Sequence, residues 1–373
     1  MALTNSVGLY IHIPFCTKIC PFCDFTKLKA TTQRYKPYID ACCREISGYY
    51  QRKKIKVDTL FFGGGTPSVL PVEFYVQLFD QLHESFDMSQ VAEVTMEFNP
   101  EDVAIDYLEK MIKLGVTRVS LGVQSFIQKE CEFLGRGHTV EQSFSALDIL
   151  KRYCVDVSLD FMFGLPDSTL DDLLYSLKRG LFYDPDHISC YGLTIEPNTP
   201  FFDLGVKPVS SEKNFKLYQC LIDTLSLKGY THYEVSSFAK DNKQCKHNNR
   251  YWRFLDYIGI GCGAHSLIDG NRICNSSHLG EYLNDSSMSL FDKKITRLTS
   301  KELICEHIIA NFRTPQGVIF EDYKHRYDID FLSVFAAEID RGVSLGLIKK
   351  STVGLTTTKK GLCFLNDVCL LFV

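Results

Sequence analysis

The sequence lacks a long apolar run, an excess of charge of either sign and a typical leader. The N-terminal stretch MALTNSVG has neither the charged start nor the apolar middle of a signal peptide, and no run approaches the roughly 18 apolar residues of a membrane-spanning helix. The net charge is only -4, so no long-range field favours nucleic acid or an anionic membrane. We therefore expect a cytoplasmic protein with small or amphipathic partners and no nucleic acid among them.

The sequence also lacks a fourth cysteine where three are crowded together. Of its fifteen cysteines, twelve are scattered singly or, as Cys42 and Cys43, adjacent in a helical pattern. We expect these twelve to be small buried apolar side chains in a reducing compartment. The exception is GLYIHIPFCTKICPFCDF, residues 8–25, where Cys16, Cys20 and Cys23 lie within eight residues. Three thiolates so close together predict a metal centre with one position left open.

The order of patterns along the chain predicts an α/β fold. Short β-rich runs alternate with stretches of helical period, which is typical of βα units with a parallel sheet. The expected strands are residues 9–13, 58–62, 93–98, 118–123, 155–161 and 188–193. The pattern decays after Pro200, so an incomplete barrel of six βα units fits better than a complete barrel of eight.

The rest of the chain predicts two further regions. Residues 206–294 are mixed and rich in His, Asn, Gly and aromatics, whereas residues 295–373 are mostly helical, with GLIKKSTVGLTTT as a small hairpin. That order resembles a winged helix. Residues 295–373 hold ten basic and nine acidic side chains, which favours packing or partner contact over DNA binding. We therefore expect three parts: the barrel (1–205), the mixed region (206–294) and the winged-helix-like domain (295–373).

Polar motifs follow each expected strand. In βα barrels the residues after the strands meet at one mouth, so these motifs should form a single site. In chain order they are the three cysteines, GGGTP (63–67), MEFNP with Glu97, GVQS with Gln124, LGRGH with Arg136, DFMFGLP with Asp160, and SCYGL with Tyr191.

The three cysteines are compatible with either of two kinds of metal centre. A structural zinc usually has four protein ligands, and His12 would be the fourth here. A 4Fe–4S cluster on three thiolates instead keeps one iron open for another ligand. The CxxxCxxC spacing, rimmed by Gly, Pro and aromatic residues, favours the cluster. An amino acid amine and carboxylate would suit the open iron, and GGGTP offers close backbone approach and the Thr66 hydroxyl.

YIHIPFCTKICPFCDF, GGGTP and LDFMFGLPDST together resemble the radical S-adenosylmethionine (SAM) superfamily, and within it the oxygen-independent coproporphyrinogen III oxidase family. The resemblance implies that Cys16, Cys20 and Cys23 hold a 4Fe–4S cluster. It implies that SAM binds the open iron and is cleaved reductively to methionine and a 5′-deoxyadenosyl radical. It also implies a set of SAM contacts: Tyr10, Gly64, Gly65, Thr66, Glu97, Gln124, Arg136 and Asp160. Within this set Glu97 would accept from the SAM amine and Arg136 would pair with its carboxylate.

Two departures separate the chain from the oxidase pattern. Phe25 stands where that pattern has a further cysteine, and Cys16 lies only fifteen residues from the start, without the oxidase's longer N-terminal segment. The chain instead resembles the HemW subfamily, which is regarded as a group of heme chaperones. That resemblance also rests on HNNRYWRFLDYIGIGCGAHS, residues 247–266.

This second motif suggests a heme site. His247 offers an imidazole for heme iron, and Tyr251 and Trp252 offer flat apolar surface for a porphyrin. His265 is a second possible ligand, and Cys245 a possible thiolate neighbour, although no CxxCH attachment motif occurs.

Three functions therefore remain open. The first is a heme chaperone that passes heme to an unidentified acceptor protein, with peripheral membrane contact through that acceptor and a possible homodimer. The second is radical decarboxylation of coproporphyrinogen III in porphyrin biosynthesis. The third is the same radical machinery acting on an unrelated substrate. Phe25 and the short N-terminus favour the first over the second, and the HNxxYW stretch disfavours the third.

Overall fold

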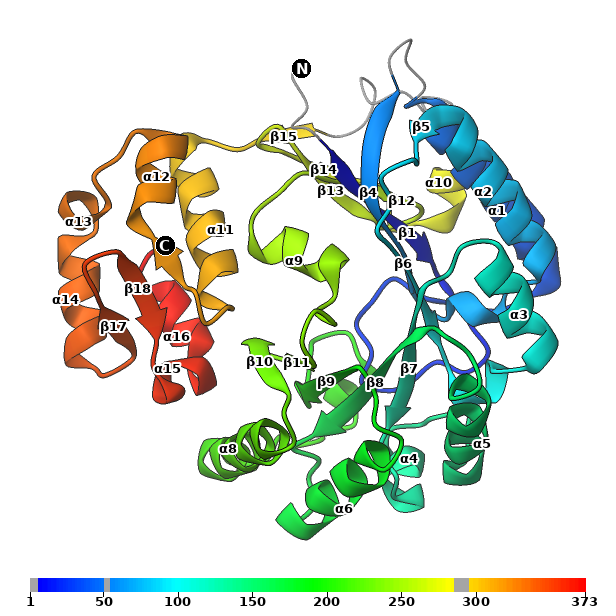
Figure 1. Ribbon diagram of the computed structural model, residues 1–373, viewed down its shortest axis with the longest axis horizontal. Helices are drawn as coiled ribbons and strands as arrows, with labels where there is room; N and C mark the ends of the chain where they lie inside the picture. The colour runs from blue at the N-terminus through cyan, green and yellow to red at the C-terminus, as the bar shows by residue number, and fades with distance from the viewer. Residues whose placement is uncertain (1–5, 50–53, 285–294) are drawn as a thin grey trace.

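A curved parallel sheet forms the centre of the protein (Figure 1). The structure is a computed structural model that describes residues 6–49, 54–284 and 295–373. Six strands follow one another in the parallel part of the sheet: β9 (His187–Gly192), β8 (Asp156–Phe163), β7 (Arg118–Gln124), β6 (Glu93–Phe98), β4 (Ile55–Gly64) and β1 (Val7–Ile13). These are the six predicted strands, so the predicted α/β fold is confirmed.

Helices cover the outer face of this sheet (Figure 1). The longer ones are α1 (Thr32–Ser47), α2 (Val72–Ser85), α3 (Ile105–Lys113), α5 (Val140–Leu150), α6 (Leu170–Leu181) and α8 (Ser211–Leu227); α4 (Gln128–Phe133) and α10 (Leu279–Asn284) are shorter. The short α7 (Pro200–Asp203) instead packs beside the cysteine loop, where the N–H of Phe201 donates to the Pro21 carbonyl at 3.0 Å. Side chains alternate between the two faces of a strand. In β1, Leu9, Ile11 and Ile13 pack into the main core with the helices. Tyr10 and His12 therefore point to the inner face.

Strands that follow β9 in the chain supply both edges of the sheet. β10 (Thr231–Glu234) and β11 (Ser237–Ala239) form a hairpin, and β11 pairs antiparallel with β9. At the other edge β12 (Tyr257–Ile260) runs parallel to β1. β13 (His265–Ile268), β14 (Asn271–Cys274) and β15 (Ile295–Arg297) continue antiparallel from there. The predicted domain boundaries stay predictions, and the one at 294/295 borders residues 285–294, which lie outside the described residues.

The C-terminal region has its own core. Its elements are α11 (Ser300–Phe312), β16 (Val318–Ile319), α12 (Phe320–Tyr327), α13 (Phe331–Val334), α14 (Ala336–Ser344), β17 (Ile348–Lys350), β18 (Gly354–Thr357), α15 (Lys359–Cys363) and α16 (Leu365–Leu370). Phe312, Tyr323 and Phe331 belong to a hydrophobic cluster that is separate from the main core. The predicted hairpin is β17–β18, and the three strands pair in the order β16–β18–β17. Helix α9 (Lys246–Trp252) lies between this region and the sheet (Figure 1).

Short elements complete the fold around the first two strands. β2 (Phe15–Cys16) pairs with β3 (Leu28–Lys29), and β5 (Phe86–Asp87) pairs with β4. Two 3-10 turns follow strand ends, η1 (Pro67–Val69) after β4 and η2 (Pro100–Asp102) after β6. In the part of the chain that the structure describes, no helix is long and apolar enough to cross a membrane.

All fifteen cysteines are free thiols. Seven of the twelve outside the motif are buried, as expected: Cys42, Cys43, Cys131, Cys190, Cys245, Cys262 and Cys305. The expectation is wrong for Cys154 and Cys274, which are exposed. Cys154 lies in the turn before β8, and Cys274 ends the surface strand β14. Both positions leave the side chain in water.

Candidate functional site

A cavity of about 420 Å³ opens at the carboxyl ends of the parallel strands. The three motif cysteines line it, together with seven of the eight residues implied as SAM contacts: Gly64, Gly65, Thr66, Glu97, Gln124, Arg136 and Asp160. Tyr191 from the end of β9 lines it as well. The expectation that the strand-end motifs meet at one mouth is therefore confirmed.

The cysteine loop is fastened at both ends. Phe15 and Cys16 pair with Leu28 and Lys29 as two short parallel strands, and the N–H of Ala30 donates to the Cys16 carbonyl at 2.9 Å. Burial raises the pKa of the Cys16 thiol to about 11, with the neighbouring cysteines adding to the effect. The loop thus holds three thiols at one wall of the cavity.

These thiols fit an iron–sulfur cluster better than a single ion. Among the described residues, no three His, Cys, Asp or Glu side chains converge on the position of one metal ion. A cluster makes a looser demand, because each thiolate binds a different iron. The His12 ring uses both nitrogens elsewhere, for the Tyr10 hydroxyl at 3.0 Å and the Thr26 carbonyl at 2.8 Å. This arrangement disfavours the zinc site completed by His12.

The glycine turn after β4 is packed tightly against the start of the cysteine loop. The N–H of Gly65 donates to the Ile13 carbonyl, and the N–H of Thr66 donates to the Phe15 carbonyl, both at 2.8 Å. A Cβ on Gly65 would lie 2.7 Å from the Pro14 backbone. The glycines are therefore needed because protein atoms already fill the space beside them, and the Thr66 hydroxyl is left next to the Cys16 thiol.

Two carboxyl groups face the cavity from neighbouring strands. Glu97 is enclosed by protein except where the cavity reaches it; burial, reinforced by the Asp160 carboxyl, raises the pKa of Glu97 to about 8. Burial also raises the pKa of Asp160, which accepts hydrogen bonds from the Ser120 hydroxyl at 2.9 and 3.2 Å. A cationic group placed between these carboxyls would relieve their mutual repulsion. The ammonium and sulfonium of SAM are such groups.

Arg136 brings a guanidinium to the cysteine side of the cavity. It donates to the Gly122 carbonyl at 3.0 Å and to the Cys20 sulfur at 3.5 Å, and also bonds to Asn99. Its Nε is buried without a hydrogen-bond partner among the described residues. A free, buried N–H donor costs free energy unless a ligand accepts from it. Arg136 therefore fits a carboxylate ligand in this cavity.

Gln124 ends β7 in a backbone conformation that residues other than glycine seldom adopt. Its φ is 62°, in the left-handed region, and the register with β8 shifts between Leu121 and Gln124. Strain of this kind concentrates at functional sites. It turns the Gln124 side chain to the cavity wall beside Arg136 and Asn99.

Tyr10 does not line the cavity. It lies one layer behind the cavity wall, under Gly63, where an added Cβ would stand 3.1 Å from both the Tyr10 ring and Glu97.

Two aromatic rings are exposed at the mouth of the cavity. Phe25 is 65% exposed and Tyr191 is 44% exposed. The position that distinguishes this chain from the oxidase pattern thus carries an exposed aromatic ring beside the cysteines.

The residues of HNNRYW expected to bind heme divide between two places: His247 contacts Tyr251, whereas Trp252 contacts the C-terminal region. His247 is fully buried at the inner face of the sheet; its Nδ1 is 3.0 Å from the Thr59 hydroxyl and its Nε2 is 2.8 Å from the Tyr251 hydroxyl. Burial lowers the pKa of His247 to about 3, so the ring is neutral. Heme ligation by His247 stays a prediction, and it requires the ring to give up one of these bonds.

Trp252 faces the opposite way along α9. The Arg313 guanidinium lies 4.3 Å from the centre of its ring, and Asn311 donates to its carbonyl at 2.9 Å. Both partners belong to or follow α11, so Trp252 joins α9 to the C-terminal region. Cys245 is fully buried beside Glu93, whereas His265 is exposed, with its Nε2 3.6 Å from the Cys274 sulfur.

Two residues near the cavity escaped the sequence interpretation. Asn99 donates to the Thr66 hydroxyl at 3.2 Å and bonds to Arg136, which links the glycine turn to the arginine. Arg118 is only 4% exposed and lies near Asp160 under the cavity floor. Asn99 belongs to the motif MEFNP. Arg118 is a charged residue on an otherwise apolar strand, two positions before Ser120 and therefore on the same inward-facing side of that strand. Both signals were present in the sequence.

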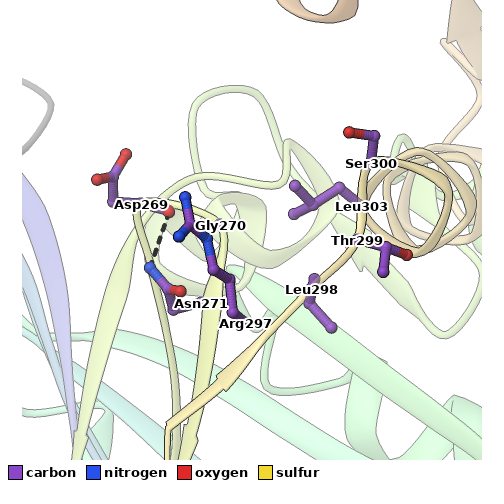
Figure 2. Close-up of a pocket in the computed structure, with 8 residues that line it drawn as sticks. All are labelled: Asp269, Gly270, Asn271, Arg297, Leu298, Thr299, Ser300 and Leu303. Atoms are coloured by element: carbon purple, nitrogen blue, oxygen red, sulfur yellow. Dashed lines mark hydrogen bonds between the residues drawn. The ribbon is translucent and has the colours of Figure 1, made fainter.

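A second cavity, of about 620 Å³, lies away from the cysteines. Figure 2 shows its wall: Asp269, Gly270 and Asn271 from the β13–β14 turn face Arg297, Leu298 and the start of α11. Asp269 and Arg297 are both exposed to solvent. Nothing in this wall resembles a catalytic or cluster-binding arrangement.

Comparison with known proteins gives a family that agrees with the cysteine-lined cavity at the strand ends. Residues 10–179 match the radical SAM superfamily, and residues 283–364 match the HemN C-terminal domain. The chain is 32% identical to proteins called heme chaperone HemW from Buchnera aphidicola, Haemophilus influenzae and Escherichia coli. Each alignment covers 98% of this chain and 98% of the relative. The chain belongs to the HemW family of the radical SAM superfamily.

The same fold occurs in a solved structure outside the HemW family. Coproporphyrinogen III oxidase (HemN) from Escherichia coli superposes with a TM-score of 0.86 and covers 100% of this chain and 91% of that chain. Its sequence is 24% identical. At that identity the likeness shows the fold, including the barrel and the C-terminal domain, and leaves the reaction open. Membership of the radical SAM superfamily implies a 4Fe–4S cluster and SAM.

Proposed function

We propose that this protein binds heme and transfers it to an acceptor protein, and that it also carries a 4Fe–4S cluster with exchangeable SAM. The observation that supports the heme part most directly is the match over 98% of both chains to proteins called heme chaperones. The exposed Phe25 in place of the oxidase's extra cysteine agrees with it. The acceptor, a possible homodimer, peripheral membrane contact through the acceptor and a cytoplasmic location belong to the same proposal.

Cys16, Cys20 and Cys23 are the proposed cluster ligands, since they are the three thiols at the cavity wall. When bound and reduced, the cluster supplies the electron for reductive cleavage of SAM. The protein's part is to bind and orient SAM. Glu97 accepts a hydrogen bond from its amine, and the free Nε of Arg136 donates to its carboxylate. Gly64, Gly65, Thr66, Gln124 and Asp160 complete the proposed contacts, with Tyr10 supporting them from behind.

Two histidines are proposed ligands for heme iron, at different costs. The first is His247, with Tyr251 and Trp252 as its porphyrin contacts. Its ring is enclosed and hydrogen-bonded at both nitrogens, so the surrounding structure must open before iron can bind to it. His265 needs no such change, because it is exposed beside the Cys274 thiol.

Hemin titration of the full chain tests this proposal. We expect about one heme per chain and transfer of that heme to apomyoglobin, a general heme acceptor. His247→Ala and His265→Ala identify the ligand, since loss of the iron bond shifts the heme absorbance while apolar contacts persist. His307→Ala is the matched control: His307 is also buried with a pKa of about 3, but it lies on α11, where its ring stacks on Phe254 and Tyr323. Failure of the unaltered protein to bind hemin would refute the heme proposal.

A further inference from the structure

The end of the cysteine loop is held by a histidine whose protonation the geometry determines. The Thr26 carbonyl can only accept a hydrogen bond, so His12 Nε2, at 2.8 Å, carries the proton. Burial lowers the pKa of His12, which leaves the ring neutral. Its Nδ1 then accepts from the Tyr10 hydroxyl at 3.0 Å. Since Thr26 follows Cys23 by three residues, Tyr10 and His12 together fix this end of the loop.

The same two rings support the end of β4, where the glycine turn begins. A Cβ on Gly64 would lie 2.5 Å from the His12 ring, and one on Gly63 would lie 3.1 Å from the Tyr10 ring. Above them, the N–H of Gly64 donates to Glu97 Oε2 at 3.1 Å. Tyr10 and His12 are therefore the floor on which the turn and the Glu97 carboxyl rest.

His247 lies behind this floor. Its ring centre is 6.5 Å from that of Tyr10 and 5.3 Å from that of Phe61, and the Tyr10 and Phe61 rings are 6.0 Å apart. Helix α9 is anchored there because Glu93 accepts from the backbone N–H groups of Lys246 and His247 at 2.8 and 3.1 Å. The bonds to Thr59 and Tyr251 then fix the orientation of the imidazole.

We propose that His247 is a positioning residue for the SAM site. By filling the space behind Tyr10 and Phe61, it keeps the Gly63–Gly64 end of β4 and Glu97 in place for the amino acid end of SAM. Tyr251 acts through its hydrogen bond to the His247 ring. This role rests on the proposed SAM site and is independent of whether the protein binds heme.

The test compares SAM binding by the anaerobically reconstituted full chain and its variants. We expect His247→Ala to weaken SAM binding about tenfold, because small displacements of a binding group cost this much or more. Its iron content should match that of the unaltered protein. The change that SAM causes in the electron paramagnetic resonance spectrum of the reduced cluster should also be altered. His307→Ala removes another buried histidine, one that lies on α11 and contacts neither Tyr10 nor Phe61, and should leave both measurements unchanged.

A double-mutant cycle separates positioning from general loss of structure. If His247 acts through Glu97, the loss of SAM affinity in His247→Ala/Glu97→Gln will be smaller than the product of the two single losses. Independent effects would multiply, and that result would overturn the proposal. Tyr251→Phe removes only the bond to the imidazole and decides the matter if His247→Ala does not fold. We expect a two- to threefold weakening from it, and unchanged affinity would then refute the role.

The remaining outcomes are also distinct. If the unaltered protein binds SAM and His247→Ala binds it equally well, the positioning role is wrong while the proposed SAM site stands. If the unaltered protein binds no SAM with a full cluster, the SAM site and the positioning role both fail.

Discussion

The backbone N–H of Gly64 donates a 3.1 Å hydrogen bond to the Glu97 carboxyl, and this bond joins the end of β4 to the end of β6. It explains how a carboxyl group can remain in an enclosed cavity. It also uses only one lone pair of one carboxyl oxygen, so Glu97 keeps acceptor capacity for a ligand.

The raised pKa of Glu97 predicts a pH-dependent stability. The folded-state pKa is about 8, above the ordinary value of 4.5, so the folded state keeps a proton that the unfolded state releases between these values. Stability is therefore greatest below about 4.5 and falls as pH rises towards 8. Glu97→Gln is neutral throughout. We expect Glu97→Gln to gain stability relative to the unaltered protein as pH rises, so that the difference in free energy of unfolding (variant minus unaltered) is about 1 to 3 kcal/mol larger at pH 8 than at pH 5.

Anaerobic urea unfolding of the cluster-free chain at the two pH values measures this difference. Asp24→Asn, at the cavity mouth, controls for removal of a carboxylate that is exposed to solvent. Equal pH dependence in Glu97→Gln and the unaltered protein would show that Glu97 titrates normally.

Gly64→Ala should destabilise the protein through a contact as well as through its backbone. Gly64 has a φ of 117°, and an added Cβ would press on the His12 ring. Gly115 is a matched control, with a φ of 112° and no atom within 4 Å of an added Cβ. We expect Gly64→Ala to cost about 1 to 3 kcal/mol more than Gly115→Ala in thermal or urea unfolding. Equal costs would mean that the His12 contact is unimportant.

The cysteine loop predicts selective loss of the cluster. Anaerobic reconstitution should give about four iron and four sulfide per chain, and serine at Cys16, Cys20 or Cys23 should abolish this content. Serine at the exposed Cys274 or the buried Cys42 should retain it. Iron and sulfide analysis with visible absorbance gives the result, and stoichiometric zinc without iron would refute the cluster.

Arg136→Ala should weaken SAM binding by about ten- to a hundredfold, the cost of one charge-assisted hydrogen bond. The cluster should still assemble, because Arg136 contacts Cys20 without being a ligand. Equilibrium dialysis with labelled SAM measures the change, and Arg152→Ala on the exposed outer surface is the control. Equal affinity in the two variants would exclude Arg136 from the SAM site.

Much of the fold follows from local sequence patterns. The six parallel strands are short apolar runs that end at polar or glycine-rich motifs, so their order and the mouth of the barrel were predictable. The limits of the strands were less predictable. The strand predicted at 58–62 extends over Ile55–Gly64, because pairing with β5 begins at Ile55 and pairing with β1 continues to Gly64. The cavity residues were predictable because each sits at a strand end.

The position of HNNRYW in the fold was not predictable from the local sequence. A histidine with aromatic neighbours suggests a ligand surface, yet His247 is enclosed because Glu93, some 150 residues earlier, anchors α9 at the inner face of the sheet. Trp252 meets Arg313 from the C-terminal region. Such long-range contacts leave no periodic pattern in a short motif. Arg118 and Asn99 could have been found by following the inward-facing positions of β7 and the end of MEFNP.

One paired assay tests the central claim most directly. The anaerobically reconstituted full chain is given coproporphyrinogen III, SAM and a reductant, and a parallel sample is titrated with hemin. We predict no protoporphyrinogen IX and about one heme bound per chain. Release of carbon dioxide from coproporphyrinogen III that depends on SAM, with no hemin binding, would contradict the heme chaperone and establish the oxidase instead.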